Sequence, residues 1–148
     1  MSEPIDELVV GYDGSEGARE ALQLARRMAA DGATVSVLHA YWIPLEVKTY
    51  EFFEDIRGGF RQVAEETLQA ASPAFEGADL DVRLEAREGS AVEVLRDVAR
   101  ERDADLIVIG SRRMGRVRAA IGSTLLDLLQ EAPCPVLVAA RHEERGSG

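Results

Sequence analysis

The heptapeptide ADLIVIG, residues 104–110, is the most apolar run of the chain, and it leads directly into GSRRMGRVRAAIGS, residues 110–123. A short aliphatic run of this kind is typical of a strand that is buried on both faces of a parallel sheet. We therefore expect residues 104–110 to lie near the centre of a sheet. The glycines, serines and arginines that follow would stand at the carboxyl end of that strand. There they form either a cradle for phosphates or a solvated loop between a strand and a helix.

The rest of the chain repeats the alternation of strand and helix around this central run. Further strands are expected at 7–12, 34–40, 80–87 and 135–140, and the last of these follows Pro133 closely. Helical periodicity fills the segments between them, including a long helix over 53–71 and another over 123–132. This order predicts an α/β fold with one open, doubly wound, five-stranded parallel sheet and helices on both faces, as in Rossmann-like proteins.

Local signals mark where these helices begin. Ser15 or Asp13 is expected to cap the first helix, and Ser90 with Glu93 forms a capping box for the third. The fourth helix is expected to open at Ser123. Residues 41–51, YWIPLEVKTYE, have no clear period and contain a proline, so they are interpreted as a loop or lid over the end of the second strand.

The composition indicates the number of domains, the kinds of partner and the cellular setting to expect. The 148 residues suit a single domain, 1–148, and the formal net charge of −10 disfavours nucleic acid as a partner. Cys134 is the one cysteine, which favours a reducing, cytoplasmic setting. No signal peptide or membrane-spanning run is present, so no membrane association is expected. The tail, 142–148, is expected to be flexible.

A ligand site is predicted where the first and fourth strands end side by side, because open α/β sheets bind ligands at such a switch point. Asp13 can accept hydrogen bonds from ribose hydroxyls, or it can serve as a helix cap. The backbones at Gly110, Gly115 and Gly122 can approach phosphates closely, or these glycines can simply serve turns. Ser123 and Thr124 at a helix N-terminus suit an anion, and that role is compatible with capping.

Arg112, Arg113, Arg116 and Arg118 fall within seven residues of an otherwise acidic chain. They can bind phosphate in bidentate fashion or pair with nearby acidic groups. The sequence contains no Walker A motif, no G-x-G-x-x-G and no cluster of ligands spaced for a metal. It offers no general base beyond Asp13. These absences favour a binding protein, with slow hydrolysis of a bound nucleotide as the enzymatic alternative.

Taken together, VVGYDGSEGAREAL, VSVLHA, EGSAVEVLRDVARERDADLIVIGS and IGSTLLDLLQEAPCPVLVA resemble the universal stress protein family over nearly the full length of the chain. The resemblance implies a cytoplasmic stress-response homodimer joined through the last strand, 135–140. An apolar edge strand of that kind needs to be paired or covered. The family also includes members that bind no nucleotide, which leaves a protein-interaction module as the alternative function.

The resemblance further implies binding of ATP or AMP, with Mg²⁺ accompanying ATP. Nucleotide-binding members carry G-x2-G-x9-G-[ST], whereas this chain has G-x4-G-x6-G-S, and Arg112 or Arg113 replaces the middle glycine. The implied contacts come from the ends of three strands and from the loop before the last helix. They are Gly11, Tyr12, Asp13, Ala40, Ile109, Gly110, Arg112, Gly115, Arg116, Gly122, Ser123 and Thr124.

Overall fold

The computed structural model describes residues 4–111 and 118–139, of which 118–124 are described as helical backbone alone. The strands are β1 (Glu7–Gly11), β2 (Thr34–Tyr41), β3 (Asp81–Glu88), β4 (Leu106–Gly110) and β5 (Val136–Ala139). The α-helices are α1 (Glu16–Met28), α2 (Phe53–Gln69), α3 (Ala91–Glu101) and α4 (Arg118–Glu131), and two short 3₁₀ helices are η1 (Leu45–Thr49) and η2 (Ser72–Phe75). No helix in the described part of the chain is long and apolar enough to cross a membrane.

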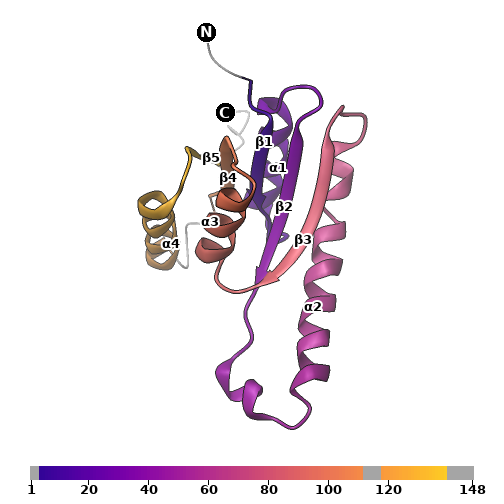
Figure 1. The fold of residues 1–148 in the computed structure, drawn as a ribbon, viewed down its shortest axis with the longest axis vertical. Helices are drawn as coiled ribbons and strands as arrows, with labels where there is room; N and C mark the ends of the chain where they lie inside the picture. Colours follow the sequence, from indigo (N-terminus) through magenta and orange to yellow (C-terminus); the bar gives the residue numbers. More distant parts are fainter. Residues whose placement is uncertain (1–3, 112–117, 140–148) are drawn as a thin grey trace, which may run out of the picture.

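All five strands are parallel, and their order across the sheet is β3-β2-β1-β4-β5 (Figure 1). The apolar run that includes β4 lies beside the central strand β1, with Leu8 opposite Leu106 and Val10 opposite Val108. The predicted open parallel sheet and its central pair of strands are therefore confirmed. The order of the strands reverses between β1 and β4, which makes that pair the switch point of the sheet.

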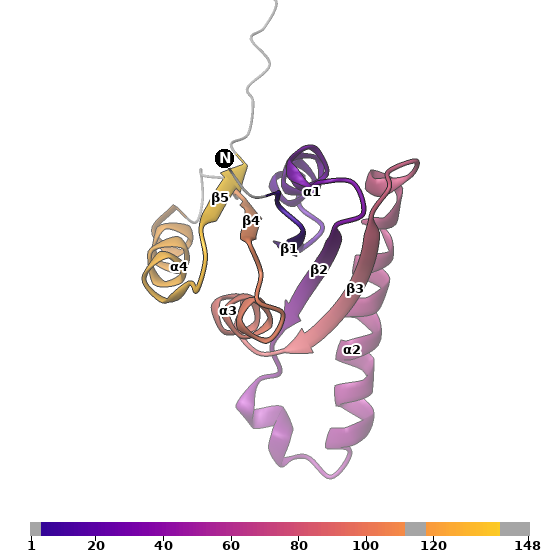
Figure 2. The same cartoon turned by 45° about the horizontal axis from the view of Figure 1, so that its top comes forward.

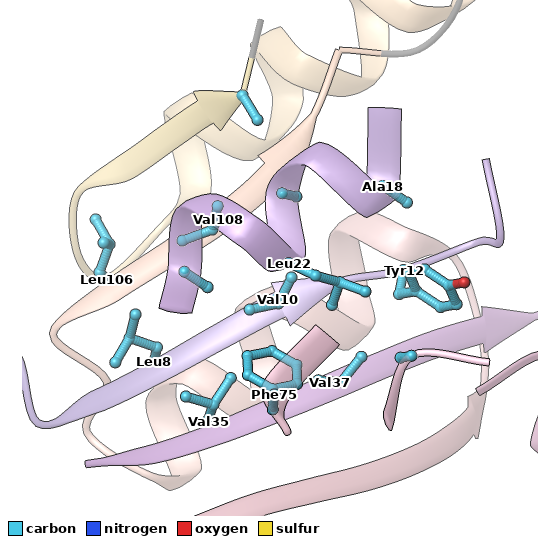
Figure 3. Close-up of a cluster of buried hydrophobic side chains, with 14 of the residues drawn as sticks. Leu8, Val10, Tyr12, Ala18, Leu22, Val35, Val37, Phe75, Leu106 and Val108 are labelled. Carbon is cyan, nitrogen blue, oxygen red and sulfur yellow. The ribbon is translucent and has the colours of Figure 1, made fainter. Parts of the chain in front are cut away.

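The two faces of the sheet hold separate apolar clusters. Leu8, Val10 and Val37 point toward α1, α2 and η2, where they pack with Leu22 and Phe75 (Figure 3). Val9, Leu38 and Ile107 point the other way, toward α3 and α4, and pack with Val98 and Leu128. Alternation along each strand produces this division, and the helices accordingly cover both faces (Figure 2).

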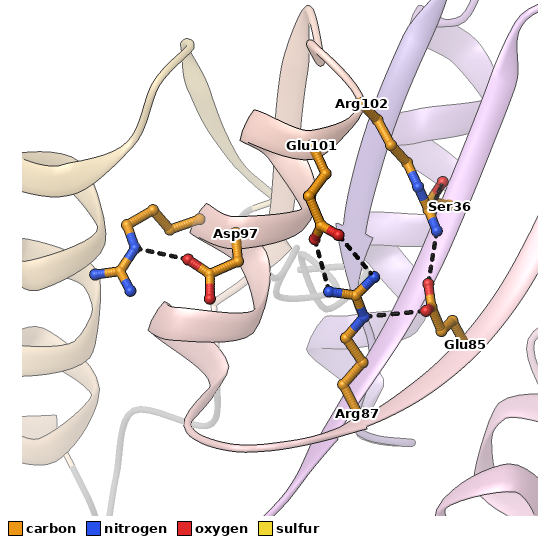
Figure 4. A network of polar contacts seen from close by, with 7 residues as sticks. Ser36, Glu85, Arg87, Asp97, Glu101 and Arg102 are labelled. Atoms are coloured by element: carbon orange, nitrogen blue, oxygen red, sulfur yellow. Dashed lines mark hydrogen bonds and ion pairs between the residues drawn. The ribbon is translucent and has the colours of Figure 1, made fainter.

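The edge strand β3 is apolar only on the face that α2 covers. Its other face carries charged side chains, which are tied to α3 by a network of ion pairs (Figure 4). Arg102 donates to Ser36 Oγ at 2.6 Å and to Glu85 at 2.7 Å, and Arg87 bridges Glu85 and Glu101. Burial works to raise the pKa of Glu85, but hydrogen bonds and charges from Arg87 and Arg102 outweigh it and hold the pKa below its usual range.

One predicted boundary is wrong. The last helix was expected to open at Ser123, but α4 begins at Arg118. The residues before Ser123 include an arginine and two alanines, which are among the best helix formers. Gly122 lowers helix propensity by only about 1 kcal/mol, which is too little to end a helix that is already formed. The capping signal at Ser123 therefore does not set the start of this helix.

Candidate functional site

The turn after β1 is held by its own polar side chains. Asp13 Oδ1 accepts a hydrogen bond from the backbone N–H of Ser15 at 2.9 Å, and Gly14 adopts a positive φ of 84°. Ser15 is the N-cap of α1, and its Oγ accepts from the N–H of Ala18 at 3.2 Å. Of the two predicted caps, Ser15 takes the role. Asp13 instead fixes the turn that precedes it, and its side chain remains exposed at the carboxyl edge of the sheet.

Two glycines allow the start of α1 to lie directly against the end of β4. A Cβ atom built on Gly110 would collide with the carbonyl group of Gly17 and would lie 2.8 Å from the backbone nitrogen of Ala18. A Cβ atom built on Gly17 would likewise collide with the carbonyl oxygen of Ser111. Gly110 was predicted as a point of close phosphate approach, and the structure provides a packing reason for this glycine.

Three of the predicted contact residues share one face of the sheet. Gly11 lies within van der Waals reach of Ile109 and Leu95, since a Cβ atom on Gly11 would stand 3.5 Å from Ile109 Cγ2 and 3.4 Å from Leu95 Cδ1. Ala40 and Ile109 border the apolar cluster beneath α3 and are only partly buried. These residues form a small apolar surface at the ends of β1, β2 and β4.

Tyr12 contributes differently from the other predicted residues. Its side chain is only 3% exposed and packs in the opposite cluster, close to Ala18 and Leu22 (Figure 3). Its N–H donates to the carbonyl oxygen of Leu38 at 2.9 Å. His39 Nδ1 donates to the carbonyl oxygen of Tyr12 at 2.8 Å. The Tyr12 side chain is therefore a core residue, and both of its backbone polar groups are engaged by β2.

The remaining predicted residues belong to the segment 112–124. Arg112, Gly115 and Arg116 lie outside the described residues. Gly122, Ser123 and Thr124 belong to the first two turns of α4, where only the backbone is described. The structure thus brings together the part of the predicted site that comes from the strand ends, and the phosphate-side residues stay predictions.

Charge is unevenly distributed around this edge of the sheet. Asp13 precedes α1, and Glu16 occupies its first turn. Two carboxylates there oppose the binding of a phosphate at the N-terminus of α1, although a helix N-terminus otherwise attracts anions. The charge at this edge therefore disfavours a phosphate at the N-terminus of α1. Within residues 4–111 and 118–139, no group of three His, Cys, Asp or Glu side chains is arranged to hold a metal ion.

Sequence reasoning missed Gly17, His39 and Leu95 as parts of this edge. Gly17 carries a weak signal, because a glycine in the first turn of an otherwise good helix is unfavourable unless something approaches closely. His39 lies within β2 and is half-buried. Its bond to Tyr12 could not be foreseen, because it depends on the neighbouring strand.

The sequence and the fold of this chain are similar to those of known proteins. The chain is 34% identical over 133 residues to a universal stress protein from Thermus aquaticus, covering 88% of this chain and 96% of the relative. Its fold is similar to a universal stress protein in complex with cAMP, with a TM-score of 0.71, 22% identity, and coverage of 92% of this chain and 97% of the other. It is also similar to a family protein from Arabidopsis thaliana with AMP bound, with a TM-score of 0.66, 16% identity and 94% coverage of each chain.

The family model described as the universal stress protein family matches residues 4–140. That match spans every strand and helix described above, and the Thermus relative covers nearly the same length. The chain belongs to the universal stress protein family.

Proposed function

We propose that this protein binds an adenine nucleotide, ATP or AMP, at the switch point between β1 and β4, and that it acts as a cytoplasmic binding protein in the stress response. The observation that carries the proposal is the small apolar surface of Gly11, Ala40 and Ile109 beside the exposed carboxylate of Asp13. An adenine ring needs an apolar surface, and a carboxylate is a pure acceptor for ribose hydroxyl groups.

The charges around the site support one orientation of the nucleotide. The carboxylates of Asp13 and Glu16 favour the ribose near α1 and keep the phosphates away from it. The phosphates would then extend toward Arg112, Arg116 and the glycines of the variant loop. Arginine offers bidentate hydrogen bonds to phosphate oxygens, which compensate for the missing middle glycine. Magnesium would accompany ATP, bound through the phosphates themselves.

Relatives with nucleotides bound lend support to this function. The fold resembles proteins whose structures contain cAMP or AMP, which share an adenosine moiety. A site that recognises mainly the adenosine moiety would explain why nucleotides with different phosphate groups bind to one fold. In this chain the adenosine side of the proposed site is the part that the strand ends supply.

The proposal is tested by substitutions on the two sides of the site. Ala40→Leu should fill the adenine side, and Gly122→Val should obstruct the phosphate approach with a β-branched side chain. Each should weaken AMP binding at least tenfold in an equilibrium titration. Gly58→Ala, which adds a Cβ where no atom lies within 4 Å, serves as the matched control. Unchanged affinity in both site variants would remove the proposed site, provided that their melting temperatures stay near wild type.

We further propose a homodimer through the outer edge of β5. This strand ends the sheet among the described residues, and it has no neighbour beyond it. Leu126 and Leu129 on the adjacent helix α4 are exposed, at 60% and 51%. A second copy that pairs with this edge would satisfy the outward backbone groups of β5 and bury part of this apolar surface.

A further inference from the structure

The connection between β2 and α2 forms an arm that extends past the carboxyl edge of the sheet (Figures 1 and 2). The arm consists of η1, the turn after it and the first half of α2. Most of the large apolar side chains that are exposed in the described part of the chain lie on this arm or at its base. They are Trp42, Leu45, Tyr50, Phe52, Phe60 and Val63, with exposed fractions from 36% to 70%. Such a concentration is typical of an interaction surface.

A groove of about 580 Å³ lies between the arm and the end of β2. His39 and Tyr41 line it from the sheet. Ile56, Phe60 and Val63 line it from α2, at the spacing that places them on one face of a helix. Farther along α2 the corresponding face is buried against the sheet, as at Leu68. The first half of α2 therefore presents an apolar stripe that the described structure does not cover.

Gly59 lines the same groove. A Cβ atom built on Gly59 would have no other atom within 4 Å, so the fold itself does not require a glycine there. A glycine within a helix costs about 1 kcal/mol relative to alanine. A missing side chain in the wall of an apolar groove leaves room for the side chain or backbone of an occupant. Gly58 is equally open but does not line the groove.

Exposed acidic side chains flank the apolar stripe of α2 and also stand on the arm. At about 100° per residue, Asp55 and Glu66 lie on the same outer flank of the apolar stripe of α2. Glu46 and Glu51 are exposed on the arm, and the structure gives neither of them an ion pair among its described residues. Lys48 Nζ and Arg57 Nε both form ion pairs with the carboxylate of Glu88, at 3.3 and 3.0 Å. An occupant therefore meets negative charge around an apolar floor.

We propose that this groove binds a basic amphipathic helix of a partner protein. Its apolar side chains would enter the groove at Gly59 and pack against Phe60 and Val63. Its lysines and arginines would meet Asp55, Glu66 and the carboxylates of the arm. This is helix-in-groove recognition, in which apolar spacing supplies affinity and charge supplies specificity.

The test uses two synthetic peptides with leucines at helical spacing, one with lysine and one with glutamate at the polar positions. Fluorescence anisotropy of the labelled peptide measures binding, and emission from Trp42, the single tryptophan, reports changes at the base of the arm. The lysine peptide should bind saturably in the micromolar range, more weakly at high salt. The glutamate peptide should not bind. Absence of saturable binding by the lysine peptide, or equal binding of both peptides, overturns the proposal.

A matched pair of variants separates groove binding from simple attraction to an acidic protein. Gly59→Leu should fill the groove and weaken binding of the lysine peptide at least tenfold, whereas Gly58→Leu makes the same change beside the groove and should leave affinity unchanged. Equal affinity in the two variants would mean that the peptide binds through charge alone, and this would overturn the proposal that it binds in the groove. If sedimentation shows a wild-type dimer that Gly59→Leu dissociates, a second copy occupies the groove and the proposed partner is wrong.

Discussion

Gly17 and Gly110 are required by backbone packing at the edge where the nucleotide site is proposed. Their backbones lie so close that a side chain on either one would collide with the other segment. The contact fixes the N-terminus of α1 against the end of β4, next to the loop proposed to bind phosphate. A loss of nucleotide binding in a Gly110 variant would therefore not identify a ligand contact, because the whole edge would be displaced.

Gly110→Ala should destabilise the protein by about 1–3 kcal/mol, as expected when an atom is forced into packed backbone. Gly17→Ala should behave similarly. The double variant should lose less than the sum, because one displacement of α1 relieves both collisions. Urea unfolding of the four proteins measures this. Gly58→Ala, in open space within α2, should be stabilising by about 0.5–1 kcal/mol. Strictly additive losses would show that the two glycines act independently.

Glu7 gives a residue-scale prediction about pH. Its Oε2 is buried and has no hydrogen-bond partner in the described structure, and burial raises the pKa of its carboxyl above the usual 4.5. A raised pKa in the folded state means that the contribution of this group to stability is present below pH 4.5 and is lost as pH rises. Its charged form therefore destabilises the fold at neutral pH.

Glu7→Gln should raise the free energy of unfolding at pH 7 by less than about 1 kcal/mol, since solvent screens a carboxylate that is only partly buried. This gain in the free energy of unfolding should shrink as pH falls below 4.5, because wild-type Glu7 is then protonated in both the folded and the unfolded state. Thermal melts of both proteins from about pH 3.5 to about pH 8, which extends to either side of the usual pKa of a glutamate, measure the difference in stability. A variant that is less stable at pH 7 would mean that the carboxylate is favourably paired.

At the scale of elements, one carboxylate holds the arm to the sheet. Glu88 ends β3 and pairs with Lys48 of η1 and with Arg57 of α2. Arg57 also lies over the Phe53 ring, with its Cζ 5.7 Å from the ring centroid. Ile43, only 1% exposed, anchors the start of the connection in the core. The position of the arm therefore depends on a few contacts at its base.

Glu88→Gln should loosen the arm. Lys48 is the only lysine of the chain, so a lysine-specific protease can cut at this one position. Cleavage under native conditions should accelerate severalfold, because it tracks the population of the opened arm. Glu65→Gln breaks the Arg61–Glu65 pair on α2 away from this clamp and serves as the control. Equal cleavage of wild type and Glu88→Gln would show that the ion pairs do not hold the arm.

The outer edge of β5 yields a second prediction at this scale. The carbonyl oxygens of Pro135 and Ala139 accept hydrogen bonds from Ile107 of β4 and from Ser111 just after it. By alternation, the backbone polar groups of Val138 point away from β4. Val138→Pro removes one outward N–H and leaves the ladder to β4 in place. We expect it to convert the proposed dimer to monomer by sedimentation. Leu137 is unsuitable for this test, because it packs against the core. A dimer that survives Val138→Pro with a folded sheet would exclude this interface.

Much of the element order could be predicted from the sequence, and the reasons are local. Short apolar runs such as residues 104–110 are typical of buried strands, and Ser15 and Ser90 mark helix starts because their side chains cap backbone N–H groups nearby. The start of α4 could not be predicted in this way. Residues 118–122 contain no capping residue and no helix breaker stronger than Gly122. Their helix propensity favours a helix from Arg118, whereas the capping signal at Ser123 predicts a later start, so the two signals conflict.

The details of the site depend on contacts between distant segments, which periodicity does not encode. The collision that makes Gly110 a packing glycine exists only once α1 is placed against β4. Tyr12 follows β1 directly, and its side chain lies in the core because it points to the same face of the sheet as Val10. A one-residue change in register would reverse this. The polar network around Arg102 likewise joins three elements. Asp13 and Gly110 could be assigned to the proposed ligand edge from the sequence, but the contacts that each residue makes there could not.

At the scale of the whole molecule, the carboxyl edge of the sheet gathers the features that bear on function. The switch point lies at the ends of β1 and β4, and the arm extends from the end of β2 at the same edge (Figure 1). His39 lies between them, since it lines the groove and bonds the backbone of Tyr12. A nucleotide site and a docking groove on one edge would allow a bound ligand to influence a partner through a short path.

The most direct test of the central claim is a calorimetric titration of the purified wild-type protein with ATP and AMP, with and without Mg²⁺. The protein is first checked for nucleotide carried through purification. Our account predicts one site per chain with micromolar affinity for an adenine nucleotide, or a copurified adenine nucleotide already in the site. No heat of binding from a protein shown to be free of nucleotide would contradict it, and would leave the arm groove as the functional surface of this edge.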